Sequence, residues 1–199
     1  MHYFNRSLRL HAVALCAFSL ALPLAAENHE LDAKGLPNFM KVNEHVFRGA
    51  QPSDAGLQEL AKMGIKTILD LRESGDRSVA EERVVKAAGM TYVSVPMAGM
   101  SAPTSAQMLK VLALLNDETA GPVFVHCRRG ADRTGAVIAA YHIDHHNWDN
   151  ARALKDANAH SMSMFQLPRK AYIMGFRART LDAKTAAPAA PVAVAATVN

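Results

Sequence analysis

Cysteine is scarce in this sequence. Among its 199 residues only Cys16 and Cys127 carry a thiol, so the chain cannot be a small domain held together by several disulfides. Cys16 lies in an N-terminal segment that we expect to be removed. The mature chain would then hold a single thiol, which excludes an internal disulfide and directs attention to Cys127.

Blocks of basic charge are also missing. No run of five or more lysines and arginines occurs, and the formal net charge is +4. The first 26 residues contain Arg6 and Arg9 and no acid, which leaves 20 basic and 18 acidic residues in the remainder. A chain so nearly balanced lacks the basic patch that is typical of nucleic-acid-binding proteins. We therefore expect no nucleic-acid partner.

The N-terminus has the three parts of a secretory signal peptide. Arg6 and Arg9 supply a positive region, residues 12–24 form an apolar run, and Ala25 and Ala26 offer small residues for cleavage. The run is shorter than the ~20 residues that a stable transmembrane helix needs, although an N-terminal anchor or a buried helix is the alternative. We predict that residues 1–26 are a signal peptide, that the protein is periplasmic or secreted, and that no stable membrane anchor remains after cleavage.

Strand-like and helix-like segments alternate between residues 36 and 179, which favours an α/β architecture. Capping signals predict three helix starts: Ser53 alone, Ser78 with Glu81, and Thr104 with Gln107. The predicted strands cover residues 65–69, 91–95 and 122–125, and the predicted helices cover residues 53–63, 78–88, 104–116, 134–145, 149–159 and 168–179.

The C-terminal stretch differs from the rest in composition. Residues 183–199 are mostly alanine, valine and proline and show no periodic apolar face, which is typical of a disordered tail. We predict one folded domain over residues 36–179, followed by this tail.

The candidate catalytic residues lie in the segment 125–135, which joins the apolar strand 122–125 to a helix. A cysteine at such a turn faces free N–H groups and the positive end of the helix dipole, which favours a thiolate at Cys127. Gly130 lets the backbone bend so that successive N–H groups form a nest for a tetrahedral oxyanion. Arg133 follows in the first helical turn, and its guanidinium can hold two phosphate oxygens at once.

A nucleophilic thiolate in a phosphate-shaped cradle indicates phosphoryl transfer to sulfur, followed by hydrolysis of the cysteinyl phosphate. The N–H groups and Arg133 would stabilise the developing charge, so no metal and no cofactor is expected. Thr134 places a hydroxyl beside the thiolate. The predicted phosphate-binding residues are Arg128, Arg129, Gly130, Ala131, Asp132, Arg133 and Thr134.

The pattern Cys127-x5-Arg133-Thr134-Gly135, preceded by His126, resembles the signature of the protein tyrosine and dual-specificity phosphatase superfamily. The resemblance covers residues 46–176. Residues 47–52 and 68–72 also resemble the small, atypical dual-specificity phosphatases of bacteria, fungi and plants. The resemblance to this superfamily implies a central, mostly parallel sheet flanked by helices, with Cys127 as nucleophile and Arg133 as phosphate clamp.

Such phosphatases usually take a general acid from a loop before the signature helix, but the matching residues 96–103 contain no Asp or Glu. Asp132 is the best substitute, and its position resembles that of an acid proposed for myotubularins and some secreted bacterial phosphatases. Alternatively, Asp132 orders the loop or pairs with a nearby arginine. Asp70, at the carboxyl end of another predicted strand, is the reserve candidate, with a helix or loop cap in the segment 70–72 as the alternative role.

His126 is expected to orient the nucleophile from the opposite side of the strand. Three histidines at the end of the helix 134–145, namely His142, His145 and His146, are typical of cations near a helix C-terminus and are not expected to bind metal.

Several functions stay open on the sequence. The first expectation is a monomeric phosphatase acting on a phosphorylated protein or a small phosphorylated substrate. Arg128 and Arg129 leave open an enzyme for inositol phosphates or phosphoinositides. A phosphate-recognition module without turnover and a sulfur-transfer loop are the remaining alternatives.

Overall fold

The computed structural model describes residues 31–32 and 34–178. The predicted signal peptide and the predicted tail lie outside the described residues. The elements follow one another as β1 (Met40–Lys41), β2 (Val46–Ala50), α2 (Asp54–Lys62), β3 (Thr67–Asp70), α3 (Asp76–Ala87), β4 (Thr91–Ser94), α4 (Ser105–Leu115), the 3-10 helix η1 (Glu118–Ala120), β5 (Val123–Cys127), α5 (Asp132–His146), α6 (Asn150–Ala159) and α7 (Leu167–Gly175).

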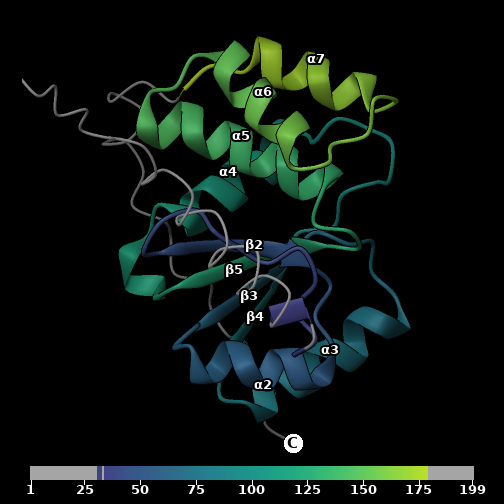
Figure 1. The fold of residues 1–199 in the computed structure, drawn as a ribbon, viewed down its shortest axis with the longest axis vertical. Coiled ribbons are helices and arrows are strands. Elements are labelled where there is room, and N and C mark those ends of the chain that lie inside the picture. The colour runs from purple at the N-terminus through teal and green to yellow at the C-terminus, as the bar shows by residue number, and fades with distance from the viewer. Residues whose placement is uncertain (1–30, 33, 179–199) are drawn as a thin grey trace, which may run out of the picture.

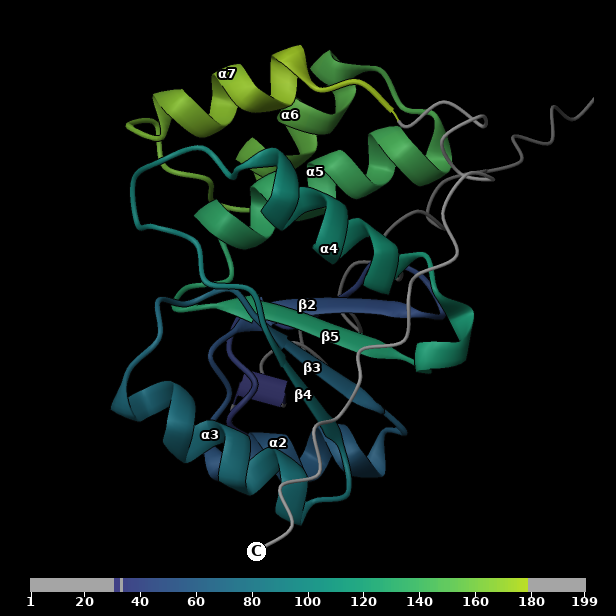
Figure 2. The ribbon, with the colours of Figure 1, turned by 180° about the vertical axis from the view of Figure 1, so that it is seen from behind.

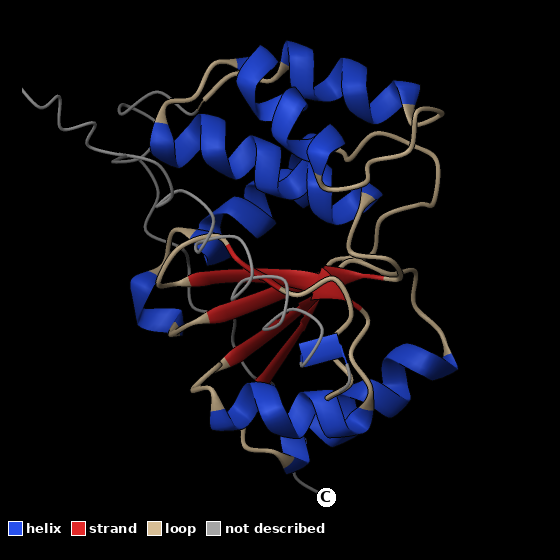
Figure 3. Ribbon diagram, in the orientation of Figure 1, coloured by secondary structure: helices blue, strands red, loops and turns tan. Residues whose placement is uncertain are grey.

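The five strands form one sheet in the order β1-β2-β5-β3-β4. β1 is antiparallel to β2, and all other neighbouring strands are parallel. Helices α2 and α3 cover one face of the sheet, and α4 to α7 lie over the other (Figure 1). Figure 2 shows the same layers from behind, and Figure 3 separates helices from strands by colour. The predicted mostly parallel sheet flanked by helices is confirmed.

The central strand β5 divides the core. Val125 and Cys127 belong to the cluster with α4 and α5, whereas Phe124 packs with α2 and α3 on the other face. Every residue of β5 is buried, as expected of a parallel strand covered on both sides. Because successive side chains point to opposite faces, His126 and Cys127 lie on opposite sides of the sheet.

Two of the three predicted helix starts are confirmed. The Ser53 side chain accepts a hydrogen bond from Gly56 N at the start of α2. Thr104 and Gln107 form a reciprocal capping box at α4, which satisfies two otherwise free N–H groups.

The predicted capping box of Ser78 and Glu81 is wrong. Helix α3 begins at Asp76 after Gly75, so Ser78 already lies inside the helix. The Glu81 side chain is buried and contacts Arg72 and His126 instead of a helix end.

Helix α5 starts at Asp132, earlier than the predicted residue 134, and this brings its N-terminus up to the cysteine loop. Ala136 and Ala139 of α5 pack with Ala153 and Ala157 of α6 in a cluster of small residues. None of the helices within residues 31–32 and 34–178 combines the length and the apolarity that crossing a membrane requires.

Candidate active site

Cys127 ends the central strand of the sheet, and the loop 128–131 leads from it into α5. The carboxyl ends of the parallel strands meet at this edge, which is where sites form in open α/β sheets. The thiol is free and only 2% exposed. It therefore forms the floor of a site and not part of the surface.

The surroundings of Cys127 favour its thiolate. Burial opposes ionisation, but the Thr134 hydroxyl, the backbone N–H groups of Thr134 and Arg129, and the charge of Arg133 outweigh it. The pKa of Cys127 consequently lies below that of an ordinary thiol. The Thr134 hydroxyl is buried and has no oxygen or nitrogen partner in the described part of the chain, which leaves it available to the sulfur. A thiol held in this way ionises more readily than an ordinary cysteine, and its thiolate is the nucleophilic form.

The loop keeps its shape because donors outside it bind its carbonyl groups. Three successive carbonyl groups of the loop accept such bonds. Because these carbonyls point away from Cys127, the N–H groups of the same loop can face the thiolate. The bonds are Gln51 N to Arg128 O at 3.4 Å, Asn38 Nδ2 to Arg129 O at 3.0 Å, and Arg48 Nη2 to Gly130 O at 2.8 Å.

Gly130 is required at its position for two reasons. Its φ is +68°, a left-handed conformation that other residues adopt only at a cost. A Cβ at this position would also lie 2.4 Å from the carbonyl carbon of Gly49. Arg48, which binds the Gly130 carbonyl, is only 2% exposed, and burial lowers its pKa while Asp156 and Cys127 attract its charge. Sequence reasoning had included Arg48 in a resembling segment without giving it a role.

The pocket above Cys127 has a volume of about 130 Å³. Its lining residues come from the loop, the start of α5 and the segment before α4: Gly99, Cys127, Arg128, Arg129, Asp132 and Arg133. A wider pocket of about 600 Å³ shares Gly99, Arg128 and Arg133 with it and extends past Gln51 and Arg77. The two pockets together give room for a phosphate and for the group that carries it.

Asp132 is the one carboxylate among the lining residues of the smaller pocket. Its Oδ2 accepts from Arg129 Nη2 at 2.5 Å, and its Oδ1 accepts from Ser163 N at 2.8 Å. Both alternatives for Asp132 therefore have support, because it faces the pocket and also orders the loop. Its role as an acid stays a prediction.

His126 lies behind the sheet, as predicted, with its ring stacked on that of Phe124. Its Nδ1 is 3.4 Å from Cys127 O. Its Nε2 lies 2.8 Å from Glu81 Oε1, an ion-pair distance when the imidazole is protonated. The sequence does not predict this contact between Glu81 and His126, because the capping pattern assigns Glu81 to a helix end.

Asp70 is wrong as a reserve acid. It is fully buried, it pairs in register with His126 and not with Cys127, and Arg72 binds both of its carboxylate oxygens. Burial acts to raise its pKa, but the bonds from Arg72 and the charge of His126 lower it below the usual value. Tyr92 donates a further bond at 2.7 Å, and burial together with this bond to Asp70 raises the pKa of the phenol above its usual value. Asp70 is thus a structural carboxylate on the far side of the sheet.

Asp70, Glu81 and His126 place three possible metal-ligand atoms within 4.8 Å of one another. The Arg72 guanidinium already contacts both carboxylates, at 2.7 Å and 2.9 Å. A metal ion would compete with this positive charge for the same oxygens, so the group fits an ion-pair network better than a metal site.

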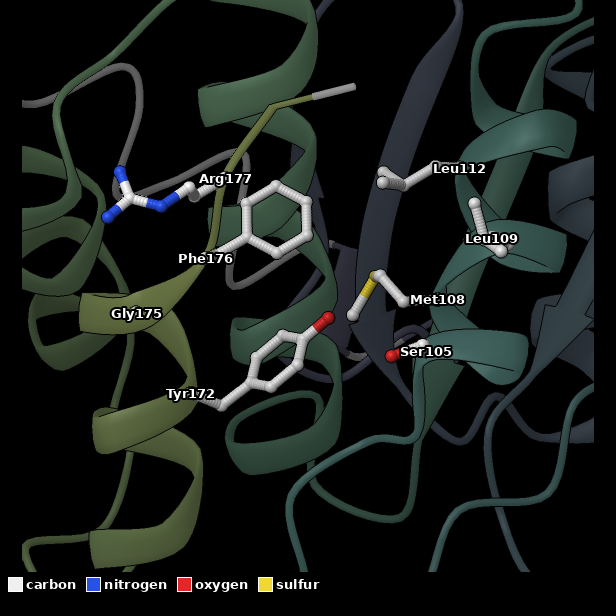
Figure 4. Close-up of a pocket in the computed structure, with 8 residues that line it drawn as sticks. All are labelled: Ser105, Met108, Leu109, Leu112, Tyr172, Gly175, Phe176 and Arg177. Carbon is white, nitrogen blue, oxygen red and sulfur yellow. The ribbon is translucent and has the colours of Figure 1, made fainter. Parts of the chain in front are cut away.

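An apolar hollow of about 500 Å³ lies between α4 and the end of α7. Figure 4 shows Met108, Leu109 and Leu112 facing Tyr172 and Phe176 across it. It contains none of the residues of the cysteine pocket, and it offers no group for the chemistry described above.

A family model described as DSP-PTPase phosphatase fused to NAD+ kinase matches residues 29–174. The chain belongs to this family. The match covers the sheet, the cysteine loop and almost all of α7, so the whole described site lies inside the DSP-PTPase region.

The dual specificity protein phosphatase TpbA of Pseudomonas aeruginosa (strain UCBPP-PA14) is 29% identical over 120 residues, 60% of this chain and 52% of TpbA. The chain therefore spans about half the length of this curated relative. The probable chloroplastic NAD kinase 2 of Oryza sativa subsp. japonica is 29% identical over 99 residues, 48% of this chain and 10% of that protein.

Solved structures of similar proteins share the fold of this DSP-PTPase family member. The crystal structure of P. aeruginosa TpbA has a TM-score of 0.61 at 24% identity, with 72% of this chain and 91% of that chain covered. The core catalytic domain of the PP-IP phosphatase SIW14 from S. cerevisiae has a TM-score of 0.62 at 22% identity, with 71% and 86% covered.

Proposed function

We propose that this chain is a cysteine-dependent phosphatase that hydrolyses phosphate monoesters of the phosphotyrosine and dual-specificity type. The observation that carries the proposal is the place of Cys127, whose buried thiol forms the floor of a pocket that Arg133 also lines. The Thr134 hydroxyl, the N–H groups of Thr134 and Arg129 and the charge of Arg133 lower its pKa despite its burial. Membership of the DSP-PTPase family and the similarity to TpbA support it.

In the first step the Cys127 thiolate attacks phosphorus, and the bond from phosphorus to the ester oxygen breaks. Backbone N–H groups of the loop and the Arg133 guanidinium stabilise the charge on the three equatorial oxygens. Asp132 lines the pocket; in its protonated form its carboxyl group gives a proton to the leaving oxygen and becomes a carboxylate.

In the second step water attacks the phosphorus of the cysteinyl phosphate. The bond from sulfur to phosphorus breaks, and Cys127 leaves as a thiolate stabilised by Thr134. The Asp132 carboxylate takes the proton from the water, which returns the acid to its starting form.

The test compares the wild type with Cys127→Ser on p-nitrophenyl phosphate and on a phosphotyrosine peptide between pH 5 and 8. We expect hydrolysis by the wild type and none above background by Cys127→Ser, with phosphopeptide binding retained. Binding without turnover by the wild type would favour a phosphate-recognition module and overturn the proposal.

A second candidate substrate class is inositol phosphates or phosphoinositides. Four arginines line the wider pocket beside the cysteine pocket, against the two acids Glu73 and Asp76. This excess of positive charge suits a substrate with more than one phosphate. A panel of phosphopeptides, inositol phosphates and phosphoinositides, ranked by kcat/KM with Cys127→Ser as control, separates this class from phosphorylated proteins.

We also propose that the enzyme is an exported monomer. The arginines, the apolar run and the small residues of positions 1–26 support export. N-terminal sequencing of protein recovered from the periplasm should begin near Glu27, and a chain that still begins with Met1 would contradict export. Size-exclusion chromatography with light scattering checks the monomer.

A further inference from the structure

Arg169 stands out as a buried charge outside the signature loop. It lies in the first half of α7, and none of its surface is exposed. Its guanidinium donates to the carbonyls of Ala98 at 2.5 Å and Gly99 at 2.8 Å, and to the side chain of Gln166. A residue late in the chain thus binds the backbone of the segment that precedes α4.

The environment of Arg169 makes its burial costly. These three partners are uncharged, and its Nε is buried without a hydrogen-bond partner in the described part of the chain. Burial and the repulsion of Arg133 lower its pKa, while Asp132 and Cys127 attract its charge. Burying a cation costs several kcal/mol unless its surroundings compensate, and an apolar side chain would fill the same space without that cost.

The segment that Arg169 binds forms a wall of the site. Gly99 lines both the cysteine pocket and the wider pocket beside it. Arg133 Nη1 also reaches this segment, 3.4 Å from Met97 O. Two arginines from different helices therefore bind three successive carbonyls of a loop that carries no acid of its own.

The turn before α7 reaches the opposite side of the same pocket. Ser163 N donates to Asp132 Oδ1 at 2.8 Å, and Gln166 Nε2 lies 3.4 Å from Gly99 O. Residues 163–169 thus contact both the pocket wall at Gly99 and the carboxylate at the start of α5. A shift of this segment would move both of them.

We propose that Arg169 is a positioning residue for the reaction at Cys127: it fixes the backbone of residues 97–99 over the cysteine pocket and adds a buried positive charge behind it. The inference rests on the proposed phosphatase function. It accounts for a buried arginine that packing alone does not require, and it gives α7 a part in the site without contact with substrate.

The test uses Arg169→Met, Arg169→Lys and a control, Arg177→Met, which makes the same change at an exposed position just after α7. Three experiments are made on each variant. The first gives kcat and KM for p-nitrophenyl phosphate. The second gives the pH midpoint for alkylation of Cys127 by iodoacetamide, detected by mass spectrometry of its peptide, and the third gives the thermal unfolding midpoint. Alkylation needs only the thiolate, so it reports on Arg169 even if the wild type hydrolyses no ester.

We expect kcat/KM of Arg169→Met to fall at least about tenfold, because small misplacements of a site are costly. Its alkylation midpoint should move to higher pH, since a charge that favours the thiolate is lost. Arg169→Lys should keep the alkylation midpoint but lose about half a decade of kcat/KM, because an ammonium lacks the planar fork that binds two carbonyls. The control Arg177→Met should match the wild type in kcat/KM and in the alkylation midpoint.

A folded Arg169→Met with wild-type kcat/KM and an unchanged alkylation midpoint would overturn the inference. If Arg169→Met does not fold, Arg169→Lys decides, and full activity of Arg169→Lys would overturn the inference. If Arg169→Lys does not fold either, Arg169 is a core residue only, and the inference is overturned as well. A wild type without turnover would overturn the proposed function instead, and the alkylation midpoints would still decide the role of Arg169.

Discussion

We expect His142 to make the free energy of unfolding of this protein depend on pH. It lies near the end of α5, is only 7% exposed, and stacks on Trp148 with ring centroids 3.9 Å apart. Its Nδ1 is 2.9 Å from Nδ1 of His146. Burial lowers the pKa of His142 from the usual 6.5 to about 4. Asp156 opposes this shift, and the charges of His146, Arg48 and Arg152 add to it.

The direction follows from proton binding. Between pH 6.5 and pH 4 the unfolded chain binds a proton at His142 and the folded chain does not, so the contribution is present above pH 6.5 and is lost as the pH falls. With a folded pKa of about 4, the loss between about pH 7.5 and pH 4.5 is roughly 2–3 kcal/mol of the free energy of unfolding.

The assay is urea denaturation of the wild type and of His142→Phe at about half-unit steps of pH over that range, followed by circular dichroism. Phenylalanine keeps an aromatic ring against Trp148 but cannot bind a proton. We expect the wild type to lose roughly 2–3 kcal/mol more than the variant. His145→Phe, the same change at an exposed position of α5, should retain the wild-type slope. Parallel curves for the wild type and His142→Phe would refute the reasoning.

Three further outcomes are expected. Asp132→Asn should lower kcat/KM for phenyl phosphate about 100-fold and much less for p-nitrophenyl phosphate, whose leaving group needs no acid; equal losses on both esters would show that Asp132 only orders the loop. Gly130→Ala should lower the free energy of unfolding by at least about 1–2 kcal/mol and weaken inhibition by vanadate, and wild-type inhibition would contradict the requirement for glycine. Glu81→Gln removes a buried charge that Arg72 and His126 share, so it should lower the free energy of unfolding by about 3–5 kcal/mol. A loss below about 1 kcal/mol, measured by urea denaturation, would show that the contacts of Glu81 with Arg72 and His126 are dispensable.

The sequence predicted those parts of the fold that depend on local pattern. The apolar run 122–125 identified a doubly covered strand, and Thr104 with Gln107 identified the start of α4, because each signal lies within a few residues of its consequence. The residue types around Cys127 predicted the loop for the same reason. Of these residues, Cys127, Arg128, Arg129, Asp132 and Arg133 line one pocket, whereas Gly130, Ala131 and Thr134 are not among its lining residues. Their individual roles stay predictions.

The parts that could not be predicted depend on contacts across the fold. Ser78 and Glu81 have the spacing of a capping box, but Arg72 and His126 bind Glu81 from other elements, and a buried ion pair outweighs a cap. Arg169 carries no local signal, since its partners are carbonyl groups about 70 residues earlier in the chain. Carbonyl groups are present at every residue, so the sequence alone does not show which of them an arginine will bind.

The outward-held carbonyls of the cysteine loop bear on protein engineering. The donors to Arg128 O, Arg129 O and Gly130 O are Gln51, Asn38 and Arg48. Arg48 lies in β2, Gln51 follows β2, and Asn38 precedes β1. An 11-residue transplant of the loop onto another strand and helix would therefore carry the nucleophile without the frame that shapes it. A successful graft would have to move residues 38–51 as well, which makes the transferable unit the loop together with β1 and β2 and not a linear motif.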